Sequence, residues 1–110
     1  MTETEKKFLS DIYNSIGLIE SFTKDLTSFA EYQEDLKTKG AVERHLGIIG
    51  EAVNKFLKAS TENKLENASK IISLRNRLIH SYDSIDDSII WSIITRQLLP
   101  LKNEISIKME

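Results

Sequence analysis

Hydrophobic and polar residues alternate with a helical period along most of the chain. The first stretch has apolar residues at the i, i+3, i+4 and i+7 spacing of an amphipathic helix: Phe8, Leu9, Ile12, Ile16 and Ile19. A longer stretch that begins near Thr38 has a similar stripe: Val42, Leu46, Ile49, Val53, Phe56 and Leu57. Gly50 falls on this stripe, where the missing side chain would let another helix approach closely. Thr27 is a candidate N-cap for a short helical segment between the two stretches.

Two further helical patterns follow. One should run from about Lys64 to His80. The other begins near Ile85, and its apolar residues cover more than one face of a helical wheel: Ile89, Ile90, Trp91, Ile93, Ile94, Leu98, Leu99 and Leu101. This last helix should therefore be buried on two sides, and a partner subunit could cover the second side. Pro100 should kink or end it. The pattern predicts an all-α bundle of four or five helices.

The composition narrows the class of protein. The 110 residues, of which 40% are hydrophobic and 29% charged, suit a single globular domain spanning residues 1–110. The chain has no cysteine, so it cannot form a disulfide or a thiolate zinc site. No stretch has the roughly 20 apolar residues of a membrane span, and a cytoplasmic location is expected. The net charge of −2 means that any binding of nucleic acid must depend on a local basic site.

The stretch Arg75 to Asp83, RNRLIHSYD, brings unusual chemistry into a helical pattern. On a regular helix Arg75 lies in the middle of the apolar face, with its apolar neighbours within about 60° of it. An unpaired charge in such a place costs several kcal/mol. Arg75 therefore requires either an internal carboxylate, for instance Glu51, or a water-filled cleft that holds an anion. Glu51 is otherwise expected to form an exposed pair with Lys55 on the opposite side of its own helix.

His80 lies about 140° around a regular helix from Arg75. The two side chains could converge if the helix unwinds near His80, or if two copies of the helix meet across a symmetric interface. Asn76 is four residues before His80 and could hydrogen-bond the imidazole and fix its tautomer. Simpler interpretations stay open: a structural ion pair for Arg75, a helix-dipole contact for His80, and a core position with the hydroxyl at the rim for Tyr82.

The spacing R-x4-H-x-Y, formed by Arg75, His80 and Tyr82, resembles the signature of HepT-like proteins of the HEPN superfamily. Two other segments strengthen this resemblance. AVERHLGIIGEAVNKF, residues 41–56, is similar to the family's second-helix segment, and IDDSIIWSIITRQLLPLKNEI, residues 85–105, is similar to its last helix. Three segments in the right order are much more specific than the short motif alone.

The resemblance implies a HEPN-type helical bundle that forms a symmetric homodimer, with both copies of the motif in a shared cleft. It further implies a ribonuclease toxin that needs neither metal nor cofactor. The partner would be an MntA-like nucleotidyltransferase antitoxin, which silences the toxin by transferring AMP from ATP onto the motif tyrosine. By position this acceptor is Tyr82.

The motif residues suit metal-free RNA cleavage, in which the 2′-hydroxyl attacks the neighbouring phosphorus. His80 can act as base or acid near neutral pH, and a dimer supplies two such histidines. Arg75 can stabilise the charge on the phosphate, whereas Asn76 could orient His80 or hold a phosphate oxygen. Arg77 would contact the substrate backbone or remain solvated. The alternative is a helical dimer without catalytic activity that binds nucleotide or RNA and docks a nucleotidyltransferase. A helical assembly protein with Arg75 paired internally is a third possibility.

Overall fold

The computed structural model describes residues 1–60, 62–80 and 86–110, together with all side chains in these ranges except those of residues 79 and 80. Within these ranges all regular structure is α-helical, which confirms the predicted all-α fold. The helices are α1 (Glu3–Thr23), α2 (Phe29–Glu34), α3 (Leu36–Ala59), α4 (Ser69–His80), α5 (Asp87–Arg96) and α6 (Leu98–Lys108). None of them is long and apolar enough to cross a membrane.

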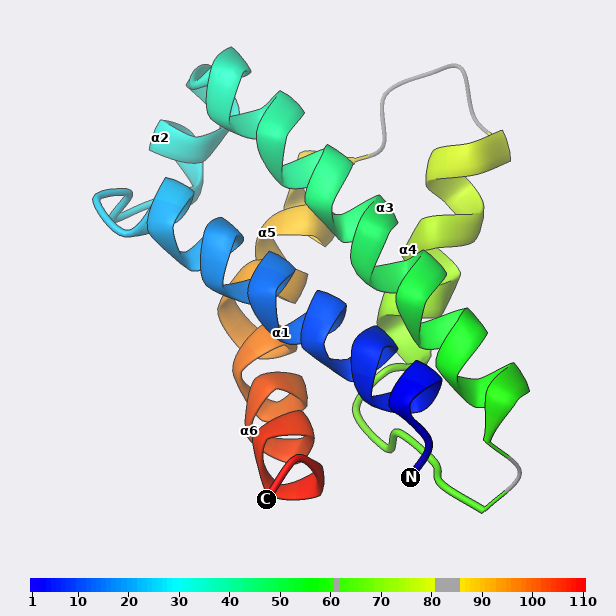
Figure 1. Ribbon diagram of the computed structural model, residues 1–110. Coiled ribbons are helices and arrows are strands. Elements are labelled where there is room, and N and C mark those ends of the chain that lie inside the picture. Colours follow the sequence, from blue (N-terminus) through cyan, green and yellow to red (C-terminus); the bar gives the residue numbers. More distant parts are fainter. Residues whose placement is uncertain (61, 81–85) are drawn as a thin grey trace.

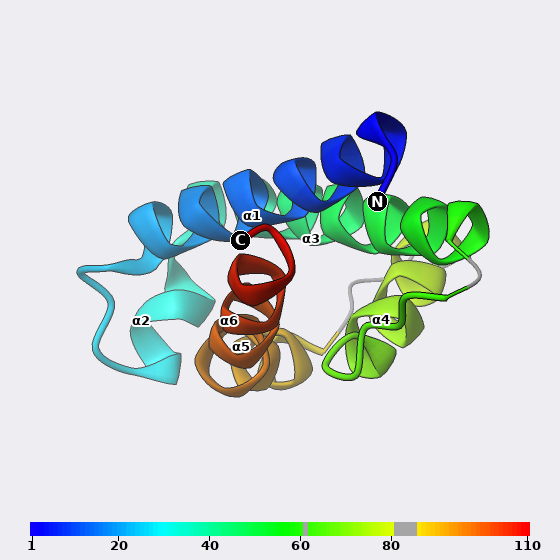
Figure 2. The same ribbon diagram turned by 60° about the horizontal axis from the view of Figure 1, so that its bottom comes forward.

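The long helices α1 and α3 lie side by side and antiparallel, and they form one layer of the molecule (Figure 1). The remaining helices lie against one side of this pair (Figure 2). Of these, α4 packs on α3, and α6 packs on α1. The core fills the space between the two layers and contains the apolar stripes that the sequence predicts, including Ile12, Ile16, Leu46 and Val53, all fully buried.

Polar side chains fix where the first three helices begin. The Thr2 side chain accepts a hydrogen bond from the backbone N–H of Glu5 at the start of α1, and Asp35 caps α3 in the same way. The N-cap of α2 is Ser28 rather than Thr27. Thr27 instead donates its hydroxyl to the Glu31 carboxylate at 3.0 Å, so the predicted cap was wrong by one residue.

The last helical pattern is divided into α5 and α6 at Gln97. Pro100 lies in the first turn of α6, where a backbone N–H would have no partner within the helix. The break thus comes three residues before the proline. Trp91 of α5 lies against the buried ring of Tyr32 in α2, with ring centroids 5.5 Å apart, so α2 covers part of the second apolar side. Leu99 of α6, which belongs to the same predicted apolar surface, is not covered and is 57% exposed.

The fourth helix starts at Ser69, five residues later than the sequence pattern indicated. A carboxylate that is distant in the sequence explains the difference. Glu104 of α6 accepts hydrogen bonds from the backbone N–H groups of Glu66 and Asn67, at 2.8 and 3.1 Å. These bonds satisfy the backbone donors in a turn, and the helix therefore begins only after it.

Candidate functional site

The contact between α3 and α4 places Arg75 directly against Gly50. A Cβ atom added to Gly50 would lie 2.4 Å from Cβ of Arg75, a distance that real side chains do not reach. The glycine thus allows α4 to cross α3 closely at this position, as its place on the apolar stripe predicts. The close approach brings the stem of Arg75 against the backbone of α3.

The guanidinium of Arg75 is paired with Glu51, the residue that follows Gly50. Nε and Nη2 of Arg75 donate to the same carboxylate oxygen of Glu51, at 2.8 and 2.5 Å. Nη1 donates to the side-chain carbonyl oxygen of Asn76 at 3.2 Å. Of the two solutions that the sequence left open, the structure has the internal carboxylate, and the expected pairing of Glu51 with Lys55 was wrong.

The Arg75 site nevertheless remains open to solvent. The Arg75 side chain is 19% exposed and that of Glu51 is 44% exposed. A guanidinium has five N–H groups, and three of them make the hydrogen bonds just described. One N–H on each terminal nitrogen therefore has no hydrogen-bond acceptor among the described residues. Glu51 and Asn76 thus fix the orientation of the guanidinium and leave two of its N–H groups without an acceptor among the described residues.

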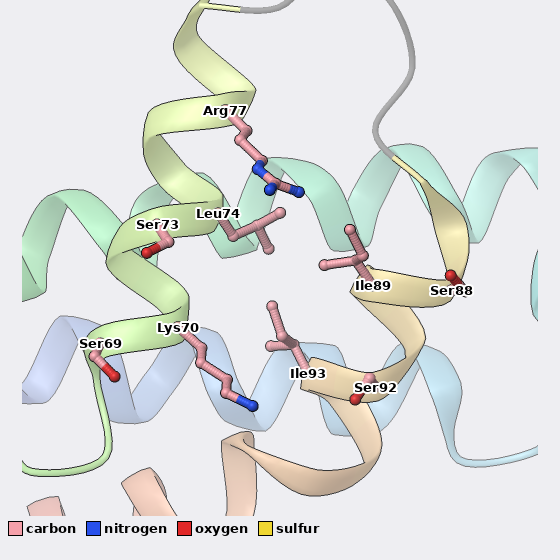
Figure 3. A pocket seen from close by; sticks show the side chains of 9 residues that line it. All are labelled: Ser69, Lys70, Ser73, Leu74, Arg77, Ser88, Ile89, Ser92 and Ile93. Carbon is pink, nitrogen blue, oxygen red and sulfur yellow. The ribbon is translucent and has the colours of Figure 1, made fainter.

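Arg77 lies on a different face of α4 and reaches into a groove between α4 and α5 (Figure 3). It is exposed and does not share the surroundings of Arg75. The structure therefore joins Arg75 with Asn76 and separates both from Arg77. His80 is the last residue of α4, but its side chain lies outside the described part of the structure, as does Tyr82 entirely.

Glu51 is the residue of this site that the sequence indicated least clearly. The helical wheel placed it opposite the apolar stripe of its own helix and gave no information on the crossing helix. A combined signal existed, namely a glycine on the stripe, a carboxylate beside it and an arginine on the apolar face of another helix. This combination identifies Glu51 as the partner of Arg75 only when it is also known that α4 crosses α3 at Gly50.

A second group of charged side chains joins α2, α3 and α5. Lys39 of α3 and Asp87 of α5 form an ion pair of 2.7 Å, with side chains only 20% and 15% exposed. Burial raises the pKa of the Glu43 carboxyl, and the nearby Asp87 charge raises it further, while Lys39 acts in the opposite direction. Burial also raises the pKa of Tyr32, whose hydroxyl has no hydrogen-bond partner within the described structure. The ion pair between Lys39 and Asp87 anchors the start of α5 on α3.

The described ranges hold no cluster of three or more histidine, cysteine, aspartate or glutamate side chains placed to bind a metal ion. The other histidine, His45, lies between α1 and α3, with Nδ1 3.4 Å from the Ser15 hydroxyl and its ring 5.6 Å from that of Phe22. It faces α1 rather than α4 and is not part of the candidate site.

Comparison with known proteins identifies the class. The family model for HepT-like ribonucleases matches residues 12–107, which include Glu51 and the whole of Arg75 to Tyr82. A protein of Methanocaldococcus jannaschii with the provisional name of an RNase is 35% identical over 104 residues, covering 93% of this chain and 94% of its own. A Thermococcus cleftensis protein provisionally named ribonuclease HepT is 33% identical over 108 residues, covering 94% of each chain. No solved structure gives a significant match.

The chain therefore belongs to the HepT-like ribonuclease family. The ribonuclease class that the resemblance implied is thereby confirmed at the level of the family.

Proposed function

We propose that this protein is a metal-independent endoribonuclease in which Arg75 and His80 carry the catalytic chemistry. The observation that carries the proposal is the family match across residues 12–107, which spans the complete motif. The geometry of Arg75 supports it, because Glu51 and Asn76 orient a partly exposed guanidinium on which two N–H groups have no acceptor among the described residues. Such a group can donate two hydrogen bonds to the oxygens of one phosphate.

The reaction begins when a base removes the proton of a ribose 2′-hydroxyl. The 2′-oxygen then attacks the adjacent phosphorus, and the bond from phosphorus to the 5′-oxygen breaks as an acid donates a proton to that oxygen. The products are a 2′,3′-cyclic phosphate and a free 5′-hydroxyl. Arg75 stabilises the charge that builds up on the phosphate oxygens, and a histidine suits the proton transfers because its pKa lies near neutrality.

The site is proposed to be shared between two subunits of a symmetric homodimer. Helix α4 is regular up to its last residue, His80, and positions 75 and 80 lie about 140° apart around such a helix. A helix that continues to His80 supports this arrangement over the alternative route, in which α4 unwinds near His80. Two copies of α4 across a twofold axis would bring Arg75 of one subunit and His80 of the other to one phosphate. Asn76 positions the guanidinium of Arg75 in this scheme.

The test of this function is RNA cleavage by the purified protein in the presence of a chelator. The wild-type protein should yield 2′,3′-cyclic phosphate ends, whereas Arg75→Ala and His80→Ala should each lose at least about a hundredfold in rate. Arg44→Ala and His45→Ala are matched controls, since they remove the same side-chain types elsewhere and should keep activity. RNA binding without any cleavage would favour the non-catalytic alternative. Cleavage that survives in folded His80→Ala would contradict the catalytic assignment.

We further propose that the protein is the toxin of a toxin–antitoxin pair, neutralised when an MntA-like nucleotidyltransferase transfers AMP onto Tyr82. The support is the family and the position of Tyr82, two residues after His80 in the motif. A nucleotide attached there would add bulk and negative charge next to the catalytic residues and would compete with RNA for Arg75. Co-expression with such an enzyme, which uses ATP and releases pyrophosphate, should add the mass of an adenylyl group (AMP minus water) to the wild-type protein and to Tyr13→Phe, but not to Tyr82→Phe. An AMP adduct that persists in Tyr82→Phe would reject this acceptor.

A further inference from the structure

A groove of about 440 Å³ runs between α4 and α5. Figure 3 shows that Lys70 and Arg77 extend from α4 toward α5, while Leu74, Ile89 and Ile93 face one another between the two helices. Leu74 and Ile93 belong to the buried core and form the floor of the groove. Four serines complete the lining: Ser69, Ser73, Ser88 and Ser92. The volume is within the range of pockets that bind a small molecule or one nucleotide.

The lining of this groove has a charge that differs from that of the protein as a whole. The nine described residues that line the groove include two cations and no carboxylate, although the complete chain has a net charge of −2. Neither Lys70 nor Arg77 forms an ion pair with another described residue. Two cations above an apolar floor, with hydroxyl groups nearby, suit a ligand that combines phosphate with a flat apolar ring system. A nucleotide unit of a nucleic acid is such a ligand.

The groove lies beside the face of α4 that carries position 80. Positions 77 and 80 are about 60° apart around a regular helix, whereas Arg75 lies about 160° from Arg77, so a strand bound at the proposed site can continue past position 80 toward Arg77. Lys70 is seven residues before Arg77, about 10 Å farther along the helix axis. The two cations therefore mark out a path along α4 that begins near the motif and ends near Ser69.

We propose that the α4–α5 groove is a subsite for the RNA strand next to the cleaved phosphate. Lys70 and Arg77 bind backbone phosphates, and one base lies over Leu74, Ile89 and Ile93. This proposal rests on the ribonuclease function proposed above and specifies where the substrate extends from the scissile bond. The cations favour RNA over a second copy of the chain as the occupant, because a dimer contact would have to bury both charges without a carboxylate among the described lining residues.

The test measures binding of a short fluorescent single-stranded RNA with 2′-O-methyl riboses, which lack the attacking hydroxyl and cannot be cleaved. Lys70→Ala and Arg77→Ala should each weaken binding several-fold at low salt, and the double variant roughly tenfold to a hundredfold. In the double variant the slope of log K against log salt concentration should become shallower by about 1.4, since two phosphate contacts are lost at about 0.7 each.

The control variant Arg44→Ala/Lys55→Ala removes the same number of cations from exposed positions on α3 and should bind as the wild type does. Lys70→Arg/Arg77→Lys keeps both charges and should retain most of the affinity, and circular dichroism verifies that each variant is folded. Unchanged affinity and salt slope in the double alanine variant, or no RNA binding by the wild type, would overturn the proposal.

Two other results would assign the groove an occupant other than an RNA strand. A double alanine variant that changes from dimer to monomer in light scattering would make the groove a contact between copies. Binding of free AMP as tight as that of the RNA, and lost in the double variant, would make it a mononucleotide site. The outcome is independent of catalysis: RNA that binds through Lys70 and Arg77 but is never cleaved in its natural form would reject the ribonuclease and keep the groove.

Discussion

At the scale of single residues, the decisive feature is the partly buried cation of Arg75. Its side chain lies against the backbone of α3 and is 19% exposed, and the charge would be costly to leave without a partner. Glu51 supplies that partner through a single carboxylate oxygen. The same hydrogen bonds fix the orientation of the guanidinium. In the proposed mechanism Glu51 is thus a positioning residue that acts on the phosphate through Arg75.

Replacement of Glu51 should separate its structural effect from its positioning effect. Glu51→Ala leaves the Arg75 charge unpaired and should lower the free energy of unfolding by about 1–2 kcal/mol, a modest value because the carboxylate is partly exposed. Glu51→Gln keeps one hydrogen-bond acceptor and should recover part of both stability and cleavage rate. Urea unfolding measures the first quantity, and kcat and KM for RNA measure the second.

Lys55→Ala, an exposed change on the same helix, is the control for Glu51 and should alter neither quantity. A positioning role predicts that Glu51→Ala lowers kcat more than it raises KM, with partial recovery in the glutamine variant. Equal losses in the alanine and glutamine variants that follow stability alone would reduce Glu51 to a purely structural partner.

The sequence could predict that Arg75 needs a partner, because helical periodicity alone places it among apolar neighbours. It could not select the partner, since the angle at which α4 crosses α3 is a property of the packed bundle. Periodicity on one helix assigned Glu51 to the solvent side, and the crossing of another helix there overrode that assignment. The sequence of one helix therefore predicts that a buried charge needs a partner, whereas the identity of the partner depends on how two helices pack together.

At the scale of helices, Gly50 controls the distance between α3 and α4. Gly50→Ala would place a methyl group 2.4 Å from Cβ of Arg75, an atom fixed to the backbone of α4. The helices must then separate, and we expect a loss of about 1–3 kcal/mol despite the better helix propensity of alanine. Gly47→Ala in the same helix meets no atom within 4 Å, so it should gain up to about 1 kcal/mol.

Thermal unfolding of the two glycine variants measures this difference directly. Cleavage of RNA should fall in Gly50→Ala as well, because α4 carries Arg75 and His80, and should be unchanged in Gly47→Ala. Similar stability of the two variants would mean that α4 does not cross α3 as closely as the structure has it.

The cluster between α2, α3 and α5 gives the protein a pH-dependent stability. Since folding raises the pKa of Glu43, this group contributes stability fully below its unfolded value near 4.5, and the contribution is lost as pH rises through the folded pKa. Glu43→Gln should therefore stabilise the protein by roughly a few tenths of a kcal/mol at pH 8 and have little effect at pH 4. Melting temperatures across this pH range, with exposed Glu34→Gln as the control, measure the effect. A destabilised variant at pH 8 would contradict the assigned direction.

Helix positions were predictable where the signal is local, and less so where it is not. The stripes of α1 and α3 and the close contact at Gly50 follow from periodicity within one segment. The start of α4 depends on Glu104, a residue 37 or 38 positions away that accepts from the backbone of Asn67 and Glu66. No window of sequence around residue 64 contains that information. The break at Gln97 has a local cause instead. Pro100, three residues later, prefers the first turn of a helix.

At the scale of the whole molecule, the proposed function requires two chains. Positions 75 and 80 face different sides of α4. A twofold axis solves this difficulty, because each site then takes Arg75 from one subunit and His80 from the other. Light scattering should accordingly give twice the mass of the 110-residue chain.

Subunit mixing tests this shared site directly. Arg75→Ala and His80→Ala homodimers should each be inactive, since every site in them lacks one catalytic group. When equal amounts are unfolded and refolded together, half of the dimers are mixed, and a mixed dimer contains one site with both Arg75 and His80. The mixture should therefore regain about a quarter of the wild-type rate. If both residues acted within one subunit, the mixed dimers would have no complete site and the mixture would stay inactive. Mixing Arg75→Ala with Arg75→Ala/His80→Ala provides the control, because no pairing of these chains can restore a site.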